Sequence, residues 1–146
     1  MKLSVFNVVL SQMPLAEACA YLKRSGVDAV EIGCGGYPGK AHCDPAILLQ
    51  DDAKLRDFRA AVADSGLEIC ALSTHGNAVH PDPAVAKVFH DDFVNAVLLA
   101  EKLGITRVVT FSGCRPAKSR NSTASARVCT RVVLPGFRTS TNWTGC

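Results

Sequence analysis

The chain has 146 residues, of which 48% are hydrophobic and 20% charged, and this composition is ordinary for a single α/β domain. Its formal net charge of +3 is unevenly distributed, because residues 1–114 hold ten Lys/Arg and thirteen Asp/Glu, whereas residues 115–146 hold six and none. The first part therefore has no basic surplus that would favour a nucleic-acid partner, and no apolar run approaches the roughly 20 residues of a membrane span.

The cysteines give no disulfide framework. There are seven of them, an odd number, and no CxxC motif occurs. Free cysteine behaves as a small hydrophobic side chain, which suits Cys19 on the apolar side of an expected helix and Cys70 in an expected strand. A reducing compartment, the cytoplasm, is the simplest interpretation.

The first expected strand covers residues 3–9, a β-rich apolar run of the kind that is buried on both faces. A helix follows, because Pro14 suits a first helical turn, apolar residues then recur at i, i+3, i+4 and i+7, and Gly26 supplies a C-cap. Residues 27–32 predict a second strand, with Glu31 at its end.

The Gly-rich segment 33–39 predicts the start of a long loop, because turn-forming residues dominate it. Asp51 or Asp52 can cap the next helix, which has apolar residues along one face and ends at Gly66. Residues 68–73 then predict the third strand.

The longest helix is predicted from Asp82, an N-cap residue followed by Pro83, to Gly104, with apolar residues at steps of three and four. Residues 106–111 predict the fourth strand. The order βαβαβαβ indicates a parallel sheet with right-handed crossovers. Two closures remain open: a small sheet with helices on both faces, or the N-terminal half of a (β/α)8 barrel.

Polar residues interrupt the apolar strands where these strands end. They are Asn7, Glu31, His75 and Ser112, and we expect them to bind substrate, because the carboxyl ends of parallel strands meet at one edge. Cys114 follows the last strand at the same edge. These residues do not identify a catalytic group.

Glu31 is the most informative of them. Alternation sets Val30 and Ile32 on one face of the strand and Glu31 on the other, which is the barrel interior if the first pair packs against helices. A carboxylate there needs a partner, which could be a ligand hydroxyl or a neighbouring Lys, Arg or backbone N–H. His75 could bind a substrate oxygen or could be a solvated loop histidine.

No metal site is predicted in this chain. His75 and His80 are five residues apart, and His42 and Cys43 lie in the neighbouring loop, but this spacing matches none of the compact zinc patterns. His90 is expected on the polar face of its helix, in contact with water.

The glycine segment also fails as a nucleotide motif. Pro38 stands where the dinucleotide fingerprint requires glycine, and Lys40 is followed by Ala41 instead of the Ser or Thr of a P-loop. Lys40 could contact an anionic group of a substrate or could simply be a solvated lysine.

Three segments resemble one family when taken together: residues 26–33 (GVDAVEIG), 72–77 (LSTHGN) and 100–109 (AEKLGITRVV). In order and spacing they are similar to the sugar phosphate isomerase/epimerase family, which has a xylose isomerase-like (β/α)8 TIM barrel. The resemblance covers roughly residues 2–114, the N-terminal half of such a barrel.

The resemblance implies metal-dependent isomerisation or epimerisation of a small-molecule sugar or sugar phosphate, with a divalent metal (Mn, Co, Mg or Zn) in the intact family. In such proteins the metal ligands and paired carboxylates come mainly from strands five to eight. Glu31 and His75 match family positions that line the substrate pocket. We therefore expect a truncated, catalytically impaired chain that binds no metal itself and self-associates through exposed barrel edges.

Residues 115–146 predict an irregular basic tail, because they contain no acidic residue and no helical stripe. Such a tail could be the product of a shifted reading frame, or a disordered extension that binds nucleic acid or an acidic partner, which would make the protein a binding module and no enzyme. A third hypothesis is a small self-contained α/β domain with its own ligand at the same edge.

Overall fold

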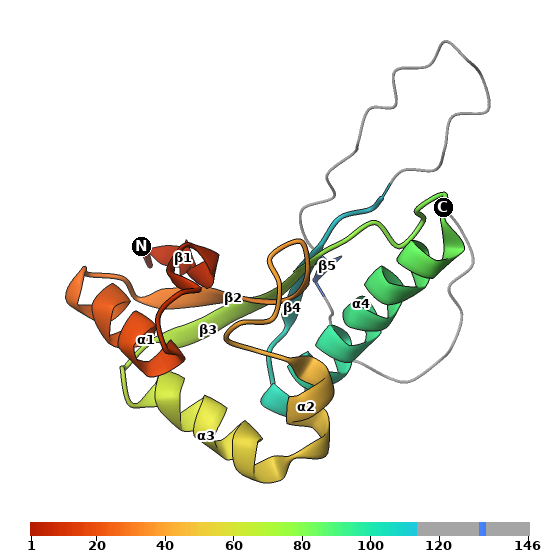
Figure 1. Cartoon of the computed structure of the whole chain (residues 1–146). Helices are drawn as coiled ribbons and strands as arrows, with labels where there is room; N and C mark the ends of the chain where they lie inside the picture. The colour runs from red at the N-terminus through yellow and green to blue at the C-terminus, as the bar shows by residue number, and fades with distance from the viewer. Residues whose placement is uncertain (114–131, 134–146) are drawn as a thin grey trace.

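Four parallel strands lie side by side in chain order in the computed structural model, which describes residues 1–113 and 132–133 (Figure 1). Each strand pairs with the next one in parallel register, and the short β5 is antiparallel to β4. The strands are β1 (Ser4–Phe6), β2 (Ala29–Gly36), β3 (Glu68–His75), β4 (Arg107–Thr110) and β5 (Val132–Val133).

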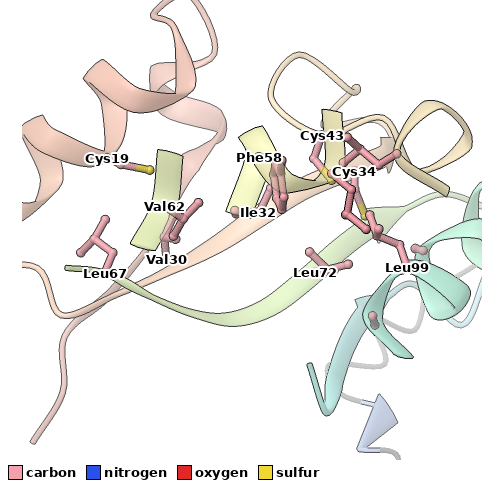
Figure 2. Packing of buried hydrophobic residues seen from close by; sticks show 14 of the residues in the cluster. Cys19, Val30, Ile32, Cys34, Cys43, Phe58, Val62, Leu67, Leu72 and Leu99 are labelled. Atoms are coloured by element: carbon pink, nitrogen blue, oxygen red, sulfur yellow. The ribbon is translucent and has the colours of Figure 1, made fainter. Parts of the chain in front are cut away.

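Helices cover one face of this sheet (Figure 1). In the part of the chain that the structure describes they are α1 (Leu15–Arg24), α2 (Pro45–Gln50), α3 (Asp52–Ala63) and α4 (Pro83–Leu103). One apolar cluster contains residues of all four helices together with Val30, Ile32, Leu72 and Val108 of the strands, each with 0% exposure (Figure 2). The core therefore lies between the helices and that face of the sheet.

The strand order decides between the two closures expected from the pattern. A doubly wound sheet reverses its strand order at a switch point and carries helices on both faces. Here the order is β1-β2-β3-β4 and the helices lie on one face, which is the arrangement of a barrel segment. The predicted α/β fold with a partial TIM barrel is confirmed.

The long helices begin and end where their caps predict. The Asp51 carboxylate accepts hydrogen bonds from the backbone N–H groups of Ala53 and Lys54 at the start of α3. The C-terminus of α4 is capped by Gly104, which has φ +73°, a left-handed conformation that suits glycine. The helix α2 was missed, although Asp44 before Pro45 is the same N-cap signal as Asp82 before Pro83.

The first strand is shorter than predicted. The apolar run 3–9 does not continue as a strand, because β1 ends at Phe6 and residues Asn7–Leu10 form a 3₁₀ helix, η1. The side chain of Asn7 turns inward to bond Gly33, while Val9 is 74% exposed. Tertiary hydrogen bonding at Asn7 thus overrides the β propensity of the run.

The second strand is longer than predicted, and its glycines are the reason. Instead of ending at Ile32, β2 continues to Gly36, and its last residues pair with Ser73, Thr74 and His75. A Cβ atom on Gly36 would overlap the backbone carbonyl of His75, so only glycine permits this approach. The third strand accordingly reaches His75 instead of Ser73, whereas β4 is confined to Arg107–Thr110.

The predicted tail lies outside the described residues, apart from Val132–Val133 in β5. Cys19, Cys34, Cys43 and Cys70 are free thiols, and the first three are buried. None of the described helices has the length and apolar character needed to cross a bilayer.

Candidate functional site

Glu31 lies on the face of the sheet opposite the helices. Its neighbours Val30 and Ile32 are fully buried in the core, whereas Glu31 is half-buried, so the predicted alternation is confirmed. The β2–β3 register sets Ser73 close by, and its hydroxyl donates a hydrogen bond to Oε1 of Glu31. The partner of the carboxylate is thus a hydroxyl group, the kind of donor that a sugar also offers.

His75 is the last residue of β3, and aromatic rings surround it. Its imidazole stacks on Phe111 with ring centroids 4.7 Å apart and an interplanar angle of 13°. Phe6 meets the imidazole edge-on, with centroids 5.7 Å apart. Burial lowers the pKa of His75 below its ordinary value, and the negative charge of Glu31 opposes this shift. Near pH 7 the ring is therefore neutral, with one donor and one acceptor nitrogen.

The aromatic contacts continue from His75 across the carboxyl edge. The ring of Tyr37 lies 6.4 Å from that of Phe111 and 5.3 Å from that of Phe89, and the Tyr37 side chain is 69% exposed. The sequence pattern does not predict these aromatic contacts. One feature of the sequence could have indicated them: Phe6 and Phe111 directly precede Asn7 and Ser112, two of the polar residues expected at strand ends.

Asn7 is buried, with 2% exposure, and both ends of its amide have protein partners. Its Oδ1 accepts from the backbone N–H of Gly33 at 3.0 Å, and its Nδ2 lies 2.8 Å from Nδ1 of His42. Because His42 Nε2 lies 2.7 Å from the carbonyl oxygen of Met13, that nitrogen carries the proton and Nδ1 accepts from Asn7. Asn7 thus joins η1, β2 and the following loop, and its contact with substrate stays a prediction.

Ser112 follows Phe111 at the carboxyl end of β4, and its side chain is exposed. The next residue, Gly113, approaches Asn77 and Val79 of the loop after β3. The structure therefore brings the ends of β3 and β4 together, as predicted. Glu31 and His75 share this region, since the charge of Glu31 acts on the imidazole.

Asp92 is a buried carboxylate that the sequence did not reveal. It lies on α4 with 8% exposure, although the neighbouring His90 is exposed as expected. Its Oδ2 accepts from the backbone N–H of Gly36 at 2.9 Å, and its Oδ1 lies 2.6 Å from Nζ of Lys40. The hydrogen bond with Asp92 raises the pKa of Lys40. Lys40 is therefore paired with a carboxylate and is not simply solvated.

The residues in the described part do not fit a metal ion. No three side chains of His, Cys, Asp or Glu converge there. Two of the histidines considered as zinc ligands have protein partners instead. His42 is hydrogen-bonded to Asn7 and Met13, and His80 Nδ1 accepts from the backbone N–H of Asp82.

Comparison with known proteins agrees with this geometry. The model of the xylose isomerase-like TIM barrel family matches residues 19–139. The chain belongs to this family. The predicted resemblance to a xylose isomerase-like barrel is thus confirmed at the level of the family, over part of a barrel.

The chain spans only part of the length of two similar proteins. The uncharacterised protein YfiH of Bacillus subtilis (strain 168) is 30% identical over 114 residues, which make up 77% of this chain and 36% of YfiH. The crystal structure of protein SMc04130 from Sinorhizobium meliloti 1021 has a TM-score of 0.51 at 23% identity, over 82% of this chain and 39% of that one. The chain thus spans little more than a third of either protein.

The lowered pKa of His75 predicts acid-sensitive stability. In the unfolded chain the imidazole has its ordinary pKa of 6.5, and in the folded protein the pKa lies lower because of burial. As the pH falls from 6.5 through the folded pKa, the unfolded state binds more protons, so the contribution of neutral His75 to stability is lost. We expect the free energy difference between wild type and His75→Gln, measured by urea unfolding, to shrink over this window.

The exposed His90 supplies the matched control for this measurement. His90→Gln removes a histidine without removing a buried ring, so a pH dependence that both variants share does not come from the burial of His75. A difference for His75→Gln that grows toward acid would contradict burial of a neutral imidazole.

Proposed function

We propose that the protein is a sugar isomerase or epimerase-type barrel chain whose described residues supply substrate contacts. The observation that carries the proposal is the Glu31 carboxylate, which meets a hydroxyl donor, Ser73, on the face of the sheet that no described helix covers. His75 lies at the same edge among aromatic rings. In a TIM barrel this edge is where substrates bind.

Each contact has a distinct chemical role in the proposal. The carboxylate of Glu31 accepts hydrogen bonds from substrate hydroxyls, as it does from Ser73. The neutral imidazole of His75 donates to or accepts from a carbonyl or hydroxyl oxygen, and Ser112 adds a hydroxyl at the end of β4. The rings of Phe6 and Phe111 hold the imidazole in place.

The proposed reaction takes a proton from the carbon beside a carbonyl. In isomerisation a proton is returned to the former carbonyl carbon while the hydroxyl proton passes to the former carbonyl oxygen, and in epimerisation a proton is returned to the opposite face of the same carbon. A divalent ion (Mn, Co, Mg or Zn) would hold and polarise the oxygens when bound. In residues 1–113 no three suitable ligands converge. We therefore propose that this chain alone binds a small sugar but is catalytically impaired.

The test uses the purified chain with a ketose in D₂O. We expect no isomerisation and no deuterium incorporation beside the carbonyl with added Mn²⁺ or Co²⁺, and we expect sugar binding detected by NMR shift changes. Glu31→Gln should weaken that binding about tenfold, since a charged acceptor is lost. Glu68→Gln is the matched control, because Glu68 begins β3 at the opposite edge and pairs with Lys2.

Two results would overturn parts of this proposal separately. Robust turnover with either metal would refute the impairment, while leaving the site in place. Binding that Glu31→Gln and Glu68→Gln alter equally would refute the assignment of the site to Glu31.

A further inference from the structure

In the part of the chain that the structure describes, the carboxyl edge of the sheet carries little positive charge. In the described connections that follow the strands, residues 7–13, 37–44, 76–82 and 111–113, Lys40 is the only Lys or Arg. The histidine at this edge that faces the aromatic rings, His75, has a lowered pKa and is neutral near pH 7. Among the described residues, Lys40 is therefore the one cationic side chain in these connections that an anion could use.

Lys40 is already held by a carboxylate that cannot move away. Its partner Asp92 has a side chain only 10% exposed, against 35% for Lys40. The Gly36 N–H fixes the second oxygen of Asp92, and Gly35 lies so near that an added Cβ would be 3.0 Å from Asp92 Cβ. Moving Lys40 to a substrate would leave a buried carboxylate without its counter-ion, which is costly.

The helix N-termini do not replace Lys40 as anion sites. The backbone N–H groups at the start of α2 and α4 are capped by Asp44 and Asp82, which accept from Ala46 and Ala84. The start of α1 has no side-chain cap, but Glu17 lies in its first turn. Carboxylates thus occupy or adjoin the positive helix ends, which a phosphate would otherwise use.

We infer that this part of the site takes the uncharged polyol portion of a substrate and disfavours a phosphate ester, and that Asp92 determines this preference by holding Lys40. The inference rests on the proposed function and narrows its substrate class. Glu31 repels an anion and binds hydroxyl groups, while the exposed ring of Tyr37 offers an apolar surface to C–H groups.

The test compares the affinities of the whole chain for fructose and for fructose 6-phosphate, by NMR titration at fixed ionic strength. We expect wild type to bind fructose at least about tenfold more tightly. Asp92→Asn keeps an oxygen for the Gly36 N–H but releases Lys40, so it should tighten fructose 6-phosphate binding about tenfold. Asp91→Asn is the matched control, because Asp91 is exposed and pairs with Lys87, and it should leave the ratio unchanged.

Adding Lys40→Met to Asp92→Asn should abolish the tighter binding of fructose 6-phosphate. This double variant shows whether the tighter binding comes from the charge of Lys40 or from a change in the fold. Wild type that binds the phosphate ester as tightly as fructose would overturn the inference and leave the proposed function standing. Equal effects of Asp92→Asn and Asp91→Asn on the affinity ratio would refute the claim that Asp92 determines the preference for uncharged sugars. Binding of neither sugar would overturn the proposed function, and the inference with it.

Discussion

Gly36→Ala is expected to destabilise the protein by more than about 3 kcal/mol, because two independent effects act at this position. Gly36 has φ +69°, where an L side chain is strained. The new Cβ would also overlap the carbonyl group of His75, the last residue of the paired strand β3, and the backbone nitrogen of the next residue, Gly76. Strand separation would then break the hydrogen bond from Tyr37 N–H to the His75 carbonyl. Urea unfolding measures the loss.

Gly39→Ala is the control that separates these two effects. Gly39 has nearly the same dihedral angle, φ +75°, but a Cβ there would meet nothing within 4 Å. We expect it to cost only about 1 kcal/mol, from backbone strain alone. If the two variants unfold at the same urea concentration, the close approach of β2 to β3 at Gly36 is contradicted.

The same glycine explains why the end of β2 could not be predicted. Locally, the sequence from Gly33 to Gly39 favours turns. The pairing that makes Gly33–Gly36 a strand comes from residues 73–75, about forty positions further along the chain. A local pattern cannot contain such a partner, and it therefore predicts a strand that ends before the first glycine, Gly33.

The placement of Glu31 and His75 was predictable because it depends on local periodicity and on strand order. Alternation along β2 fixes the face of Glu31, and parallel strands bring their ends to one edge. Asp92 had no such signal. It occupies a helix that was predicted correctly, but its partner Gly36 lies 56 positions away, and an aspartate beside Asp91 resembles any other charge on a polar helix face.

Asn7→Ala is expected to cost about 2–4 kcal/mol, although the position is a single polar residue in an apolar run. The change leaves the N–H of Gly33, a buried residue, without its acceptor, and it leaves Nδ1 of His42 without its donor. It also opens a cavity where a side chain with 2% exposure was packed. Urea unfolding of the variant and of wild type measures the difference.

A double-mutant cycle with His42→Ala shows whether the hydrogen bond itself is responsible. The two changes together should cost less than their sum by at least about 0.5 kcal/mol, because each removes the same bond. Asn95→Ala, on the half-exposed side of α4, should stay within about 0.5 kcal/mol of wild type. A small effect of Asn7→Ala would mean that η1 forms without this anchor. The shortening of β1 would then need a cause within residues 7–10 themselves.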